Sequence, residues 1–169
     1  RGARFYPLLY MLTRVYGARD WGSGLELCKH ILGKAAALQL HHIFPKARLY
    51  ELGWSTAEVN ALANLTFLTT ETNLEISDQE PAVYLPKYLV KQPGAVRSHW
   101  IPEDPDLWRF ENYSAFLAER RALLAAAANS FLEQLLAGAV PESALQETGC
   151  EILGSIASAE EEALLTTAH

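Results

Sequence analysis

The spacing of apolar and polar residues predicts a mostly helical chain with two short strands. In five segments, apolar residues recur every three or four positions, as they do along one side of an α-helix. A period-two alternation predicts a strand over residues 38–44, and a second strand is predicted over residues 65–70. The helices are predicted over residues 4–16, 23–32, 55–63, 81–90 and 113–137.

Capping residues and a proline mark where three of these helices begin. Ser23 followed by Glu26, and Ser55 followed by Glu58, have the spacing of a capping box, in which each side chain bonds the backbone of the other residue. Pro81 suits the first turn of the next helix. In the central part of the chain, the order is therefore strand, short helix, strand, turn and helix. We predict an α+β fold class, mostly helical.

The composition is that of a folded domain. Half of the 169 residues are apolar and 20% are charged, and no apolar run approaches the roughly 18 residues that a membrane span needs. Cys28 and Cys150 are the only cysteines, which argues against a disulfide scaffold and a cysteine zinc knuckle. We expect a cytoplasmic protein without a membrane partner. Because the sequence starts at Arg1 without an initiator Met or a signal region, we also expect further domains upstream.

Charge is distributed unevenly along the chain. The net charge is −6, but residues 1–100 carry eleven Lys and Arg against eight Asp and Glu, whereas residues 101–169 carry three against twelve. A polyanion such as nucleic acid is therefore expected to contact the first part. Residues 139–169 hold six Glu and no Lys or Arg. We predict that they form an acidic appendage, partly helical or frayed, to a domain over residues 1–138.

Two adjacent histidines and two asparagines are the main candidates for chemistry. His41 and His42 stand near the end of the first predicted strand, Asn64 directly before the second, and Asn73 in the turn that follows it. Adjacent histidines that face an amide side chain could hold one divalent ion beside a free imidazole. Taken singly, each residue has a simpler interpretation: histidines satisfied in the core or at the surface, a strand-start cap at Asn64, and a turn residue at Asn73.

As a set, these residues resemble the motif of HNH nucleases of the His-Me finger, or ββα-metal, superfamily. That motif is an Asp-His or His-His pair, then an Asn, then a His or Asn; here Asn64 and Asn73 are nine positions apart. The run over residues 1–138, with HHIFPKARLYELG and VNALANLTFLTTETNLEIS, is similar to the C-terminal nuclease region of GmrSD-like restriction proteins. The resemblance implies a small ββα-metal finger embedded among helices. It also implies a ParB-like, nucleotide-hydrolysing or recognition domain earlier in the same polypeptide.

The resemblance implies a role for each residue of the motif. His42 would be the general base that takes a proton from water, and a neutral imidazole with a pKa of about 6.5 suits that task. His41 and Asn73 would be the protein ligands of a divalent metal, and Asn64 would hydrogen-bond the backbone of the histidine loop. The implied cofactor is Mg²⁺ or Mn²⁺, with Ni²⁺, Co²⁺ or Zn²⁺ also suited to an imidazole ligand.

Two further features bear on this site. Lys46 and Arg48 follow the histidine pair and are the expected nucleic-acid contacts, although scattered basic residues are usually a solvated face. Neighbouring side chains of a regular strand point to opposite faces, so His41 and His42 can both reach one ion only if the chain leaves strand geometry at the pair. Pro45, close behind, favours such a departure.

We therefore expect a metal-dependent DNA endonuclease or nickase that acts on double-stranded DNA, the effector domain of a bacterial anti-phage restriction system. Two alternatives stay open. One is a catalytically silent module of the same fold that binds DNA or a partner domain. The other is an RNA-cleaving toxin of the same superfamily. In each case sequence recognition is expected to reside in the upstream domain.

Overall fold

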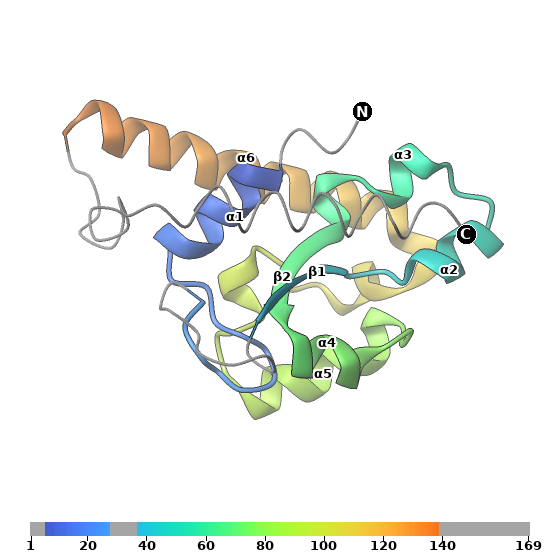
Figure 1. Cartoon of the computed structure of the whole chain (residues 1–169). Helices are drawn as coiled ribbons and strands as arrows, with labels where there is room; N and C mark the ends of the chain where they lie inside the picture. Colours follow the sequence, from blue (N-terminus) through green and yellow to red (C-terminus); the bar gives the residue numbers. More distant parts are fainter. Residues whose placement is uncertain (1–5, 28–36, 139–169) are drawn as a thin grey trace.

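Residues 6–27 and 37–138 are described by the computed structural model of the chain (Figure 1). They form a mostly helical α+β fold around one two-stranded sheet, as predicted. In this part of the chain, no helix is both long and apolar enough to cross a membrane. The predicted appendage over residues 139–169 lies outside the described residues. The strands are β1 (Leu38–His42) and β2 (Leu65–Thr69), and the α-helices are α1 (Tyr6–Val15), α2 (Lys46–Glu51), α3 (Thr56–Val59), α4 (Thr70–Ile76), α5 (Pro81–Lys91) and α6 (Tyr113–Leu136).

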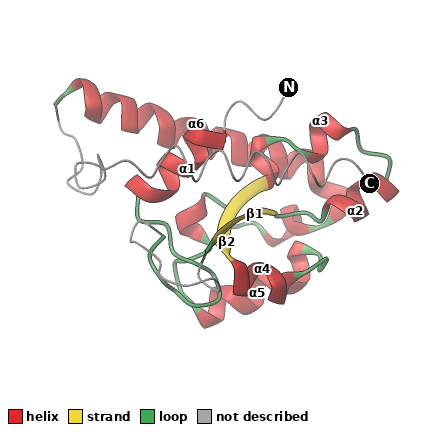
Figure 2. Ribbon diagram, in the orientation of Figure 1, coloured by secondary structure: helices red, strands yellow, loops and turns green. Residues whose placement is uncertain are grey.

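The sheet lies in the middle of the fold. Its antiparallel ladder runs from Leu38 opposite Thr69 to His42 opposite Leu65. Figure 2 shows the two strands between α1 and α6 on one side and α4 and α5 on the other. A small apolar cluster lies on the side of α1 and α6. A larger cluster surrounds Trp21 on the side of α5 and includes residues from the first half of α6. The residues of the small cluster are Leu9, Leu65, Phe67 and Leu124.

Two short helices, α2 and α4, were not predicted, whereas the capping box of α3 was. The Ser55 side chain accepts from the Glu58 N–H while the Glu58 carboxylate accepts from the Ser55 N–H. α4 begins at Thr69, whose side-chain oxygen accepts from the Thr72 N–H, so β2 passes into a helix where a turn was predicted. Four 3-10 helices complete the described elements: η3 (Leu62–Asn64), η4 (Arg97–His99), η5 (Pro105–Trp108) and η6 (Phe110–Asn112).

The helix predicted over residues 23–32 is wrong where the structure describes it, up to residue 27. Ser23 does not cap a helix, because its N–H and its hydroxyl both donate to the Asp20 carboxylate at 2.8 Å. Glu26 forms a β-bridge with Arg19 instead of completing a capping box. Residues 28–32 lie outside the described residues.

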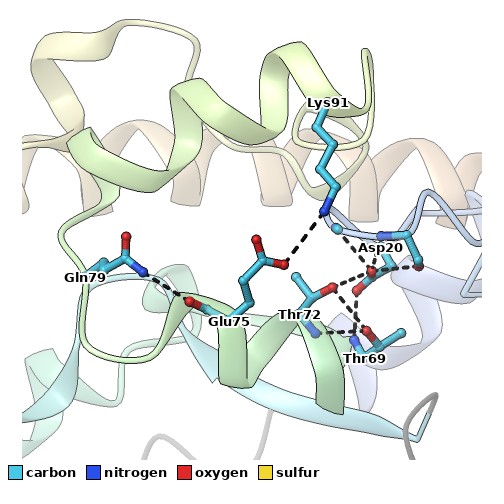
Figure 3. A network of polar contacts seen from close by, with 8 residues as sticks. Asp20, Thr69, Thr72, Glu75, Gln79 and Lys91 are labelled. Carbon is cyan, nitrogen blue, oxygen red and sulfur yellow. Dashed lines mark hydrogen bonds and ion pairs between the residues drawn. The ribbon is translucent and has the colours of Figure 1, made fainter.

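Asp20 fastens this loop to the junction of β2 and α4. Figure 3 shows its carboxylate pointing at Thr69 and Thr72, with bonds of 2.9 Å from the Thr69 N–H and 2.6 Å from the Thr72 hydroxyl. Burial raises the pKa of Asp20, but the hydrogen bonds from Thr72, Thr69 and Ser23 outweigh burial and hold the pKa below its ordinary value. The charged carboxylate therefore stabilises the junction at neutral pH. In the same view, Lys91 of α5 pairs with Glu75 of α4.

Arg120, in the first half of α6, holds the opposite end of the sheet. Its side chain is fully buried, and its guanidinium donates to the carbonyls of Ala63 (2.9 Å), Leu65 (2.7 Å) and His99 (3.2 Å). Burial lowers the pKa of Arg120 to about 9, so the group is still charged at neutral pH. These three bonds tie α6 to η3, to the start of β2 and to η4.

Candidate functional site

One face of β1 brings His41 together with Asn73 of α4. The Nδ1 atom of His41 lies 2.7 Å from the Asn73 Oδ1 atom, and the Asn73 Nδ2 group donates to Oε1 of Gln39 at 2.7 Å. Gln39 precedes His41 by two positions, so both side chains lie on the same face of the strand. Because Gln39 takes the amide N–H of Asn73, the amide oxygen is turned towards His41. An amide oxygen only accepts, so Nδ1 of His41 carries the proton.

The His41 ring is buried in an aromatic surrounding. Only 3% of the residue is exposed, and the ring stands edge-on to Trp21 (6.1 Å between centroids) and Tyr84 (6.2 Å). Burial lowers the pKa of His41 to about 4, a bond to Asn73 opposes the shift, and the neighbouring His42 adds to it. The ring is therefore neutral at pH 7. Its Nε2 atom has no hydrogen-bond partner among the described residues.

These donor atoms fit a divalent ion in their chemistry. One imidazole nitrogen and one amide oxygen converge from β1 and α4, and both types bind Mn²⁺, Co²⁺, Ni²⁺ or Zn²⁺. A lone pair at Nδ1 of His41 requires the ring proton to move to Nε2, which is buried beside no described acceptor. A buried donor without a partner costs about 1–3 kcal/mol, so ion binding here would be weak in the absence of other ligands.

His42 lies on the opposite face of β1. The ladder continues to His42 opposite Leu65, so the expected departure from strand geometry at the histidine pair is wrong. The Nε2 atom of His42 lies 3.0 Å from Oδ1 of Asn60, the residue that ends α3, and not near Asn73. Burial lowers the pKa of His42, the bond to Asn60 opposes this shift, and the charge of Lys46 adds to it.

Asn64 lies behind the histidine pair and bonds the loop that follows it. Its side chain is fully buried, accepts from the Phe44 N–H at 2.8 Å, and donates to the carbonyls of Val59 (2.9 Å) and Phe44 (3.2 Å). The Asn64 carbonyl also accepts from the Ile43 N–H at 2.8 Å. Every one of these bonds is to backbone. Asn64 therefore fixes the path of the chain directly after His42.

The two basic residues expected to contact phosphate differ in their surroundings. Lys46 is the first residue of α2, half-buried, and close enough to His42 for its charge to affect the pKa of that ring. Arg48 is exposed, pairs with Glu51 at 3.3 Å, and lies over the Phe110 ring. Lys46 therefore adjoins the site, whereas Arg48 already has partners on its own helix and in η6.

Gln39 and Asn60 were not predicted as site residues, although the sequence carries a signal for each. Gln39 stands two positions before His41 in a predicted strand, which by itself places the two side chains on one face. Asn60 falls inside the helix predicted over residues 55–63, whereas the observed helix α3 ends at Val59 and has Asn60 as its C-cap. Asn is a common residue at helix C-termini, and this is the signal that the sequence carries. Neither signal reveals the partner, which comes from another element in both cases.

No family model, curated protein or solved structure matches this chain.

Proposed function

We propose that this protein is a metal-dependent DNA endonuclease or nickase that hydrolyses phosphodiester bonds. The observation that supports the proposal is the placement of His41 with Asn73 on one face of β1 and of His42 on the other face. Within the described residues, β1 pairs only with β2, so its second edge has no strand beside it. A phosphodiester at that edge would have a candidate metal site on one side and a candidate base on the other.

In-line hydrolysis needs this arrangement. The attacking water approaches the phosphorus opposite the leaving oxygen, so the base and the group that stabilises the leaving oxygen must lie on opposite sides of the phosphate. Residues 41 and 42 would supply these two groups from opposite sides of a phosphate at the strand edge, because neighbouring residues of a strand point to opposite faces. The geometry that prevents the two histidines from sharing an ion is thus the one that in-line attack favours.

Each residue then has one task. His42, neutral at pH 7 because burial and Lys46 lower its pKa, takes a proton from water. Lys46 neutralises part of the phosphate charge, and Asn64 holds the loop that carries the base. A divalent ion held by His41 and Asn73 would stabilise the charge that develops on the phosphate and the leaving oxygen. Because water is the nucleophile, no 2′-hydroxyl is required, and DNA can serve as the substrate.

The proposal extends to the biological setting implied by the motif. We propose that the chain is the effector domain of a bacterial anti-phage restriction system and that another domain of the same polypeptide recognises the DNA. The first hundred residues carry only three more basic than acidic residues, which gives little counterion release on binding. We therefore expect the isolated chain to bind double-stranded DNA weakly and with strong salt dependence.

The experiment is nicking of supercoiled plasmid in Mg²⁺, Mn²⁺, Co²⁺, Ni²⁺ and EDTA. Wild type should cut in Mg²⁺, cut faster in the metals that imidazole prefers, and stop in EDTA. His41→Asp should shift the preference towards Mg²⁺, and Asn73→Ala should lose activity while Asn129→Ala, on the exposed side of α6, keeps it. Full activity of His41→Ala in every metal would contradict the metal site.

One observation favours the silent binding module as a second candidate. The hydrogen bond between His41 and Asn73 already occupies the nitrogen and the oxygen that would bind a metal. His41 is also almost fully buried. That module would bind DNA in a gel-shift assay and cut it in no metal. The same plasmid assay, repeated on structured RNA, separates the DNase from an RNA-cleaving toxin.

A further inference from the structure

We infer that Asn60 is a positioning residue for His42, which it holds in the Nε2–H tautomer so that Nδ1 is the atom that accepts the proton. The catalytic part of this inference rests on the proposed function, because it concerns the base of that reaction. The tautomer and orientation of the ring do not depend on the reaction, and they can be measured without it.

The orientation of the Asn60 amide is set by its second hydrogen bond. Its Nδ2 group donates to the Thr56 carbonyl at 3.0 Å, one helical turn earlier. A carbonyl only accepts, so the amide nitrogen of Asn60 must lie on the Thr56 side and its oxygen must face His42. The contact of 3.0 Å between Oδ1 of Asn60 and Nε2 of His42 is therefore a bond donated by the imidazole.

A neutral imidazole has one N–H and one lone pair. With the proton on Nε2 bound to Asn60, the lone pair is on Nδ1, and only that atom can take a proton from water. When Nδ1 accepts the proton, the ring becomes a cation, water is left as hydroxide, and the Nε2–H bond to Asn60 becomes charge-assisted and stronger. Asn60 thus stabilises the charged ring more than the neutral one, and it adds no charge of its own to a site that must admit phosphate.

Asn60 is itself held firmly. The helix that it ends, α3, is closed at its other end by the capping box of Ser55 and Glu58. The Tyr113 hydroxyl of α6 donates to the Glu58 carbonyl at 2.8 Å, and the Asn64 amide donates to the Val59 carbonyl at 2.9 Å. The acceptor for His42 is therefore carried by a turn that is fixed from both α6 and η3, as an orienting group requires.

The first test is nitrogen-15 NMR of the His42 ring in the metal-free protein at one neutral pH. Wild type should show a single Nε2–H tautomer whose ring proton exchanges slowly enough to be observed. In Asn60→Ala that proton should exchange freely and both tautomers should be populated, whereas Asn60→Asp should keep the slow Nε2–H proton, because a carboxylate also accepts. A wild-type ring with its proton on Nδ1, or an unchanged ring proton in Asn60→Ala, would overturn the inference.

The second test is plasmid nicking by the same variants. Asn60→Ala should lose about 10- to 100-fold in rate, as is usual for groups that orient a catalytic side chain, and Asn60→Asp should recover most of that loss. In a His42→Ala background the Asn60→Ala change should have no further effect, and Asn129→Ala, at an exposed position of α6, is the matched control. If Asn60→Ala does not fold, Asn60→Leu keeps the volume without the acceptor and takes its place. A wild type that never cuts but shows the Asn60-dependent ring proton would support the inference and defeat the proposed function.

Discussion

The two faces of β1 differ more than two neighbouring histidines would suggest. His41 faces Trp21 and Tyr84, is 3% exposed, and is surrounded by core. His42 is half-buried on the other face, within reach of Asn60 and the charge of Lys46. A strand can thus place one residue in a dry, rigid surrounding and the next in a wetter one. We expect substitutions at position 41 to affect stability as well as activity, and those at position 42 to affect activity alone.

The largest expected effect is on cleavage, and it separates the two faces most clearly. His42→Ala should lower the nicking rate about 10²- to 10⁴-fold, the usual contribution of a general base, with a nearly unchanged melting temperature. His41→Ala should also be nearly inactive, but its melting temperature should fall, because the change leaves a void in the core. Nicking rates and thermal melts of both variants test the comparison. If His42→Ala cuts at the wild-type rate, the role given to that residue is wrong.

The next effect concerns the loop that joins the two faces. Asn64→Ala leaves the Phe44 N–H and the Val59 carbonyl without their partners, and each unpaired buried group costs about 1–3 kcal/mol. We expect both the free energy of unfolding and the nicking rate to fall, whereas Asn129→Ala, at an exposed position of α6, should lower neither. Urea unfolding measures the loss. An unchanged unfolding midpoint would mean that Asn64 does not hold the histidine loop.

Acid should destabilise the protein through the histidines that are buried in its core. His99, like His41, has a pKa lowered to about 4, first by burial and then by the charge of Arg120, although its bond to the Arg19 carbonyl and the charge of Asp20 oppose the shift. In the unfolded chain these two histidines take up a proton near pH 6.5, whereas in the folded protein they do so only near pH 4. The free energy of unfolding is therefore highest above about pH 6.5 and falls as the pH drops towards about 4. Acidification from pH 7.5 to pH 5 should lower the free energy of unfolding by about 2 kcal/mol for each of these buried histidines.

Urea unfolding at several pH values, in wild type and His99→Gln, checks this dependence. The variant should show a smaller loss of stability on acidification, because one of the titrating rings is gone. The stabilisation by the Asp20 carboxylate is present at neutral pH and is lost only at lower pH, because hydrogen bonds hold the pKa of Asp20 below its ordinary value of 3.8. Equal pH dependence in both proteins would show that His99 is not held neutral in the folded state.

The smallest effect is expected from the basic residues of α2. Lys46→Ala should weaken DNA binding about equally for all sequences and reduce the salt slope by about 1, as loss of one phosphate contact does. Arg48→Ala should have less effect, because Arg48 already pairs with Glu51 and lies over Phe110. Binding measured by fluorescence anisotropy over a range of salt concentrations compares the two. A larger loss in Arg48→Ala would place the DNA on the other side of the helix.

The sequence was informative where apolar periodicity or a local cap decides the structure. The long apolar repeat predicts α6, and the spacing of Ser55 and Glu58 predicts α3, because both signals are contained in a few consecutive residues. α2 is too short to show a period, and only Leu49 of its residues is buried. α4 is rich in threonine, which favours strands, and its start depends on the Thr69 side chain.

Errors occurred where a distant side chain changes a local signal. Ser23 and Glu26 have the spacing of a capping box, but the Asp20 carboxylate takes the Ser23 hydroxyl and is itself fixed by Thr72, more than fifty residues away in sequence. In the candidate site, the motif indicated His41, His42, Asn64 and Asn73, but the departure from strand geometry expected at the histidine pair was wrong, because the ladder continues to His42. The contacts of Gln39 with Asn73 and of Asn60 with His42 could be identified only from the three-dimensional structure, because no local sequence pattern connects these residues.

The buried Arg120 has a consequence for anyone who would shorten or transplant this protein. The unit of β1, β2 and α4 looks like a small module, but the carbonyls of Ala63, Leu65 and His99 have their donor in α6. A fragment that stops before α6 would lack the buried guanidinium of Arg120 and would leave those carbonyls without their hydrogen-bond donor. The smallest portable piece therefore extends through Arg120, and a graft of β1, β2 and α4 onto another scaffold would have to include a substitute for the guanidinium.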